Sequence, residues 1–129
     1  MKVVPIQKLI PIGTVLNQAV NGTAIPLQDV VNFSVNVVFT GTPTGTFKLQ
    51  GSSDITNSGL PNSSASGLNA PAVNWTDLTG YTQAVSASGS ILWNFSNAGI
   101  SWVRLAYVDG SGGTSTAVVT IANFYGKGW

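Results

Sequence analysis

The side chains that could carry out acid–base chemistry in this 129-residue chain are four aspartates, because histidine, cysteine and glutamate are all absent. A Ser-His-Asp triad and thiolate chemistry are therefore excluded. Two aspartates could form a glycosidase pair, but each of the four falls at a predicted turn or strand end, where aspartate usually bonds the local backbone. They are Asp29, Asp54, Asp77 and Asp109. We expect a protein that is not an enzyme and has no cofactor.

Calcium is the metal ion that these aspartates could bind. Loop carboxylates and backbone carbonyls are calcium ligands, and the sequence offers Asp54 with Asn57, or Asp109 with the glycine-rich run Gly110–Thr114. The chain has no Asp-x-Asp spacing. The sequence therefore predicts no specific metal site.

Charge is scarce along the whole chain. Charged residues make up 7% of the sequence and the net charge is +1, against roughly 25% charged residues in a typical soluble domain. The few lysines are scattered, so we expect no direct recognition of nucleic acid. No apolar run approaches the ~20 residues of a membrane span. A chain this neutral either stays dissolved through Ser, Thr and Asn or covers much of its surface in an assembly, and we favour an assembly.

The clearest structural signal is the stretch 101–109. Val103, Leu105 and Tyr107 alternate with Trp102 and Arg104 in the period of two that is typical of a strand. A glycine-rich turn and a second alternating stretch, 116–123, follow, so we predict a hairpin. Two more hairpins are expected, one around Asn21-Gly22 and one joining 33–39 to 46–50 through a turn at 41–45.

Together these patterns predict an all-β protein. Turns recur every 8–12 residues, no window has helical periodicity, and eight to nine short strands can be assigned. We expect an antiparallel β-sandwich, and the absence of a cysteine pair favours a jelly-roll-like sandwich over an immunoglobulin-like one. The expected organisation is an extended arm at 1–13, a sandwich domain at 14–123 with a long loop at 51–73, and an aromatic tail at 124–129.

The two ends are apolar and are the expected contacts between subunits. The arm contains Pro5 and Pro11, which restrict any pairing to a sheet edge; an ordinary first strand is an equally good interpretation. If the tail carries assembly contacts, deleting it should leave the monomer folded. The predicted interface residues are Val3, Val4, Ile6, Leu9, Ile10, Trp102, Phe124, Tyr125 and Trp129.

Three segments of the chain are considered together: 45–54, the run Asn74-Trp-Thr-Asp-Leu-Thr79, and 102–114 with its Trp-Val-Arg start. In these segments the chain resembles a small β-sandwich protein common in bacteriophage genomes. The resemblance spans roughly 31–123 and assigns no function to single residues. It implies a structural protein of the virion, either a capsid component or a cement, decoration or spike-base protein, whose partners are copies of itself and other virion proteins.

A second hypothesis is a carbohydrate-binding module or the receptor-binding part of a phage tail or spike. In such modules exposed tryptophan and tyrosine side chains stack on sugar rings. The chain has four tryptophans and three tyrosines. The alternative for these aromatic residues is ordinary core and sheet packing, since most of them fall within predicted strands.

Overall fold

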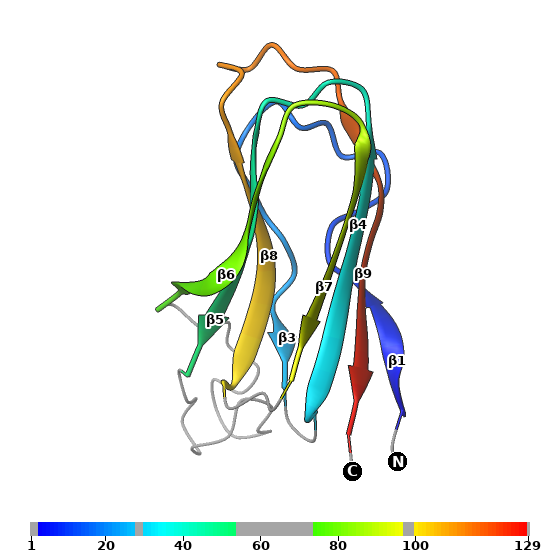
Figure 1. The fold of residues 1–129 in the computed structure, drawn as a ribbon, viewed down its shortest axis with the longest axis vertical. Helices are drawn as coiled ribbons and strands as arrows, with labels where there is room; N and C mark the ends of the chain where they lie inside the picture. The colour runs from blue at the N-terminus through cyan, green and yellow to red at the C-terminus, as the bar shows by residue number, and fades with distance from the viewer. Residues whose placement is uncertain (1–2, 28–29, 54–73, 97–99, 129) are drawn as a thin grey trace, which may run out of the picture.

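The computed structural model describes residues 3–27, 30–53, 74–96 and 100–128. These residues form two antiparallel sheets packed face to face, so the predicted all-β sandwich is confirmed (Figure 1). The strands are β1 (Val3–Lys8), β2 (Val20–Asn21), β3 (Ile25–Pro26), β4 (Asn32–Thr40), β5 (Gly45–Ser52), β6 (Thr76–Val85), β7 (Gly89–Phe95), β8 (Trp102–Asp109) and β9 (Val118–Lys127). No helix in the described ranges is long and apolar enough to cross a membrane.

The strand order is that of a jelly roll. The first sheet has the order β1-β9-β4-β7, and the second has the order β2-β8-β5-β6, with β3 also on β8. Pairing is nested along the chain: β1 pairs with β9, β2 and β3 with β8, β4 with β7, and β5 with β6. The chain is thus one long antiparallel ribbon wound into two Greek keys, which is the topology of a jelly roll. The jelly-roll-like prediction is therefore confirmed.

The three predicted hairpins are wrong. β4 and β5 lie in different sheets, and so do β8 and β9, so the turns at 41–44 and 110–117 are crossovers at one end of the sandwich (Figure 1). At Asn21-Gly22 the chain does not turn back on itself, because β2 and β3 both pair with β8. The alternation of apolar and polar residues correctly indicates the strands themselves. It does not indicate whether the next strand joins the same sheet or the opposite one.

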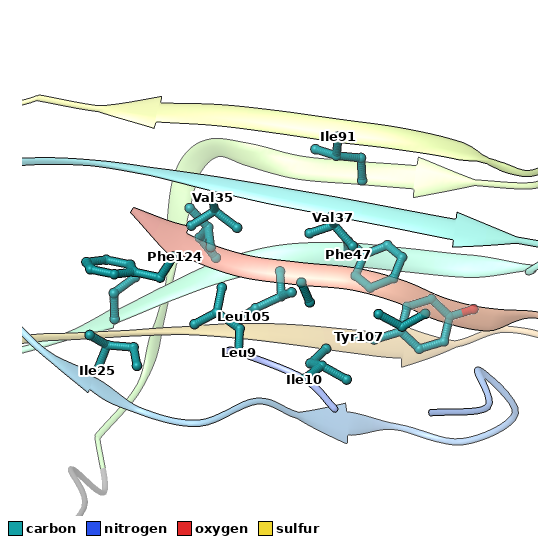
Figure 2. Packing of buried hydrophobic residues seen from close by; sticks show 14 of the residues in the cluster. Leu9, Ile10, Ile25, Val35, Val37, Phe47, Ile91, Leu105, Tyr107 and Phe124 are labelled. Atoms are coloured by element: carbon teal, nitrogen blue, oxygen red, sulfur yellow. The ribbon is translucent and has the colours of Figure 1, made fainter. Parts of the chain in front are cut away.

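The core lies between the two sheets. Val35 and Val37 of β4 lie in the core with Phe124 of β9 and with Leu105 of β8 from the second sheet (Figure 2). Phe33 of β4 belongs to the same cluster. The ring of Phe33 lies 5.2 Å from that of Phe124 and 5.0 Å from that of Phe95. Burial of each large apolar side chain stabilises the fold by roughly 1.5–3 kcal/mol, so this layer holds the two sheets together.

Both predicted end segments belong to the sandwich. β1 pairs with β9 in the register Val3↔Lys127 and Lys8↔Asn123, so the expected arm is an edge strand of the chain's own sheet. Residues 124–127 continue β9 and pair with β4 as well. We therefore correct the expectation that the tail can be removed from a folded monomer, because its deletion would shorten a central strand.

Candidate functional site

The predicted interface residues are divided between core and surface. Leu9 and Ile10 are 1% exposed and Phe124 is 0% exposed, and all three belong to the core between the sheets. Their placement at a subunit interface is corrected, because these side chains fill the sandwich and present no surface to a neighbour. Trp102 is 4% exposed, but it lies outside this core and alternates with the inward Val103 and Leu105, so its place at an interface stays a prediction. Ile6 on β1 is 61% exposed.

The remaining predicted positions lie at the chain ends. Tyr125 is half-buried on β9, where its hydroxyl is 3.4 Å from the amide nitrogen of Asn123, which donates to it. The backbones of Val3 and Val4 pair with Lys127 and Gly126. Trp129 lies outside the described residues, as does most of the predicted loop 51–73.

The first candidate surface is the outer side of the first sheet, where nine uncharged side chains form three rows across β9, β4 and β7. The register aligns them as Tyr125–Ser34–Asn94, Asn123–Asn36–Leu92 and Ile121–Val38–Ser90. We call these nine positions the outer grid. Their outward direction follows from the alternation with the buried residues of the same strands.

The outer grid combines amides and hydroxyls with exposed apolar groups. Leu92 is 64% exposed and Ile121 is 37% exposed. Depletion of charged residues is typical of the core of a protein–protein interface, because a charge is costly to desolvate unless it is paired. This surface could not be predicted from the sequence, since the register partners across β4 and its two neighbours are more than fifty positions apart in the chain and no local pattern connects them.

The second candidate surface is a polar cluster on the outer side of the second sheet. Arg104 Nε donates to Gln50 Oε1 at 2.8 Å, and Gln50 Nε2 donates to Asp77 Oδ1 at 2.8 Å. Lys48 Nζ lies 3.2 Å from the Asp77 carboxylate. The Arg104 guanidinium stacks over the Trp75 ring, 4.4 Å from its centroid, a contact worth about 0.5–1 kcal/mol at an exposed site.

This polar cluster unites the three sequence segments that carry the phage resemblance. The segments lie on β5, β6 and β8, which are neighbours in the order β8-β5-β6. The hydrogen bonds from Gln50 and Lys48 lower the pKa of Asp77, and burial lowers the pKa of Arg104. The cluster can bind polar groups beside an aromatic ring, but its carboxylate is ionised and paired, so it does not provide a general acid.

Asp109 anchors the crossover that follows β8. Its carboxylate accepts hydrogen bonds from the Ser111 hydroxyl at 2.6 Å, the Ser111 backbone N–H at 2.9 Å and the Gly113 N–H at 3.0 Å. The sequence offers Asp109 as a conceivable calcium ligand, but donors from its own turn occupy both carboxylate oxygens. Among the residues that the structure describes, no three His, Cys, Asp or Glu side chains cluster as a metal site. Asp54 and Asn57 lie outside the described residues.

The bonds around Asp109 predict an acid-dependent loss of stability. The Ser111 hydroxyl, followed by its backbone N–H, lowers the pKa of Asp109 in the folded chain. A carboxyl with a lowered folded pKa stabilises the fold above its unfolded pKa, and this contribution disappears as pH falls through the folded pKa. We expect Asp109→Asn to lose less stability than the wild type between about pH 5 and pH 2, measured by urea unfolding. Equal losses in both proteins would contradict the assignment.

Comparison with known proteins returned no relative. No protein-family model, curated protein or solved structure matches this chain. The class of protein is thus defined by the fold alone, as a jelly-roll β-sandwich with an uncharged outer grid on one sheet and a paired polar cluster on the other.

Proposed function

We propose that the protein is a non-enzymatic structural protein of a bacteriophage particle that self-assembles in or on the capsid, as a capsid component or a cement or decoration protein. The outer grid is the observation that carries this proposal. It is a surface on three neighbouring strands that is free of charge at nine adjoining positions, and it can therefore be covered by another protein without desolvating an ion.

Two further features support an assembly role. Jelly rolls are a recurrent architecture of viral capsid proteins, although fold alone does not define function. The resemblance of three segments to phage β-sandwich proteins points in the same direction. A non-enzymatic role is consistent with the one carboxylate in the polar cluster, Asp77, whose pKa is lowered and which is paired with Lys48.

The alternative, glycan binding, rests on the polar cluster. Trp75 offers an aromatic ring next to Arg104, which bonds to Gln50 and through it to Asp77. Sugars are bound by such a combination of stacking and hydrogen bonds. Against this, Arg104 covers one face of the Trp75 ring and the polar groups bond to one another. We therefore favour the outer grid as the functional surface.

The decisive test is quantitative mass spectrometry of gradient-purified particles of the phage that encodes the chain. We expect the protein in the particle, with hundreds of copies for a shell or cement protein and tens or fewer for a vertex or tail component. Absence from the particle would contradict the proposal. Glycan binding that is lost on Trp75→Ala would then support the alternative.

A matched pair of variants tests the outer grid itself. Asn36 lies at its centre, between Asn123 and Leu92. Asn36→Asp places an unpaired charge there, which costs several kcal/mol if the surface is covered, so we expect at least a ~10-fold lower copy number in particles. Thr82→Asp, exposed on the outer side of the second sheet, is the control and should assemble normally. Equal incorporation of both variants would exclude the grid as the assembly surface.

A further inference from the structure

β7 is an edge strand without the usual protection against pairing. It bonds to β4 on one side, and on its other side no strand of the described ranges pairs with it. Its sequence, Gly-Ser-Ile-Leu-Trp-Asn-Phe, contains neither proline nor charge. Natural proteins usually block such edges with lysine, proline, bulges or short strands, because the free backbone groups can bind another chain.

The other described edges have such protection. β1 contains Pro5 and Lys8 and has a register shift between Val4 and Gln7. β2 and β3 are two residues long each. β6 bulges between its pairs with Lys48 and Gln50 of β5, and includes Gly80 at a φ of +88°. Among the strands described, β7 is therefore the edge best suited to pairing.

The orientation of the β7 backbone follows from one hydrogen bond. The Tyr81 hydroxyl, on β6 in the other sheet, donates to the carbonyl of Asn94 at 3.1 Å, so this carbonyl points away from β4. In an antiparallel pair the N–H and C=O of one residue point to the same side, and the side alternates along the strand. The backbone groups of Ser90, Leu92 and Asn94 thus face the open edge.

We propose that β7 pairs antiparallel with β7 of a second copy of this chain, with Leu92 opposite Leu92 of the partner subunit. The strand is nearly palindromic about Leu92: Ile91 and Trp93 flank it, followed by Ser90 and Asn94. With a two-fold axis at Leu92, the outward residues of one β7 lie beside the outward residues of the other, and the inward residues beside the inward ones. Because β7 has no charged residue, no two charges of this strand meet. It also places the outward backbone groups of Ser90 opposite those of the partner's Asn94. The Asn94 carbonyl accepts from the Tyr81 hydroxyl on one lone pair, and the pairing uses the other.

A second copy fits this edge better than an unrelated strand because the pairing extends a surface the chain already has. Leu92 belongs to the outer grid and its side chain is 64% exposed. Pairing at Leu92 joins the first sheets of two copies into one continuous sheet and makes the two grids contiguous. The inference rests on the proposed function in so far as it names the contact by which copies assemble.

The absence of cysteine makes cross-linking a clean test. Residues of a hydrogen-bonded antiparallel pair have Cα atoms about 5.5 Å apart, within the range of roughly 4.4–6.8 Å for disulfides. Under mild oxidation we expect most of Leu92→Cys to form a disulfide dimer. Val108→Cys, which is 46% exposed on the second sheet, is the control and should stay mostly monomeric. The register predicts that mixing Ser90→Cys with Asn94→Cys gives more cross-linked dimer than either variant alone.

A charge substitution tests the same contact without a covalent cross-link. Leu92→Lys places like charges directly opposite each other, and we expect at least a ~5-fold weaker dimer by sedimentation equilibrium. Val108→Lys should leave dimerisation unchanged, and circular dichroism verifies that each variant is folded.

The pairing is overturned if Leu92→Cys cross-links no faster than Val108→Cys, or if the wild type is a monomer at all concentrations. A protein found in particles without cross-linking at position 92 refutes this contact alone. A β7-paired dimer that is absent from particles refutes the proposed function alone.

Discussion

Phe124→Ala is expected to lower the free energy of unfolding by about 3–5 kcal/mol, the usual cost of removing a fully buried phenylalanine. Phe124 is 0% exposed at the centre of the first sheet, and its ring packs 5.2 Å from that of Phe33. Phe33 in turn stacks on Phe95 of β7 at 5.0 Å, with an angle of 4° between the rings. The substitution removes the ring that packs against Phe33 and leaves a cavity between the sheets. Since domains of this size are stable by about 5–15 kcal/mol, much of the fold's stability depends on this one ring.

Tyr125→Ala is the control for this prediction because it changes the next residue of the same strand. Tyr125 is half-buried in the outer grid, and its polar contact is with Asn123 on the same face. We expect it to cost about 1 kcal/mol, the central value for point substitutions, because this side chain is only half-buried. The measurement is urea unfolding monitored by tryptophan fluorescence. If Tyr125→Ala proves more destabilising than Phe124→Ala, the inward direction of Phe124 is wrong.

The contrast between these two neighbours explains what the sequence could and could not predict. The alternation of apolar and polar residues correctly indicates which side chains of a strand face the core. On β4, for example, Val35 is buried and its neighbour Asn36 lies on the outer side. For the apolar residues at the chain ends, the sequence predicts contacts with a neighbouring subunit. Leu9, Ile10 and Phe124 fill the core instead, because β1 pairs with β9 at the edge of the chain's own first sheet.

The pairing of strands was beyond local sequence reasoning for a physical reason. In a jelly roll most consecutive strands lie in opposite sheets, so a short glycine-rich turn marks a crossover as readily as a hairpin. The outer grid could not be predicted for the same reason. Asn36 and Asn123 are register partners but lie far apart in the sequence, so no local pattern connects them. The polar cluster was not predicted either, although three segments noted in the sequence, 45–54, 74–79 and 102–114, contribute its residues from neighbouring strands.

Gly22→Ala is the second substitution for which we expect a large effect, a loss of about 1–3 kcal/mol or more from overpacking. The dipeptide Asn21-Gly22 is the strongest hairpin signal in the sequence, but Gly22 is required here for close approach. A Cβ at this position would lie 2.7 Å from the backbone carbonyl oxygens of Leu105 and Leu9. Neither oxygen can move freely, because the Gly22 N–H donates to Leu105 at 2.7 Å and the Thr23 N–H donates to Leu9 at 2.9 Å.

Gly89→Ala is the matched control for Gly22→Ala. A Cβ there would meet only the far end of the Phe39 ring, at 4.0 Å, and Gly89 is not among the described glycines with a positive φ. We expect its stability to remain within about 0.5 kcal/mol of the wild type. If Gly22→Ala were equally neutral in thermal and urea unfolding, the chain at 21–22 would not be pressed between β8 and the segment after β1. A hairpin at Asn21-Gly22 would then have to be considered again. A large loss confined to Gly22→Ala would show that this glycine is needed where the chain after β2 packs against β8.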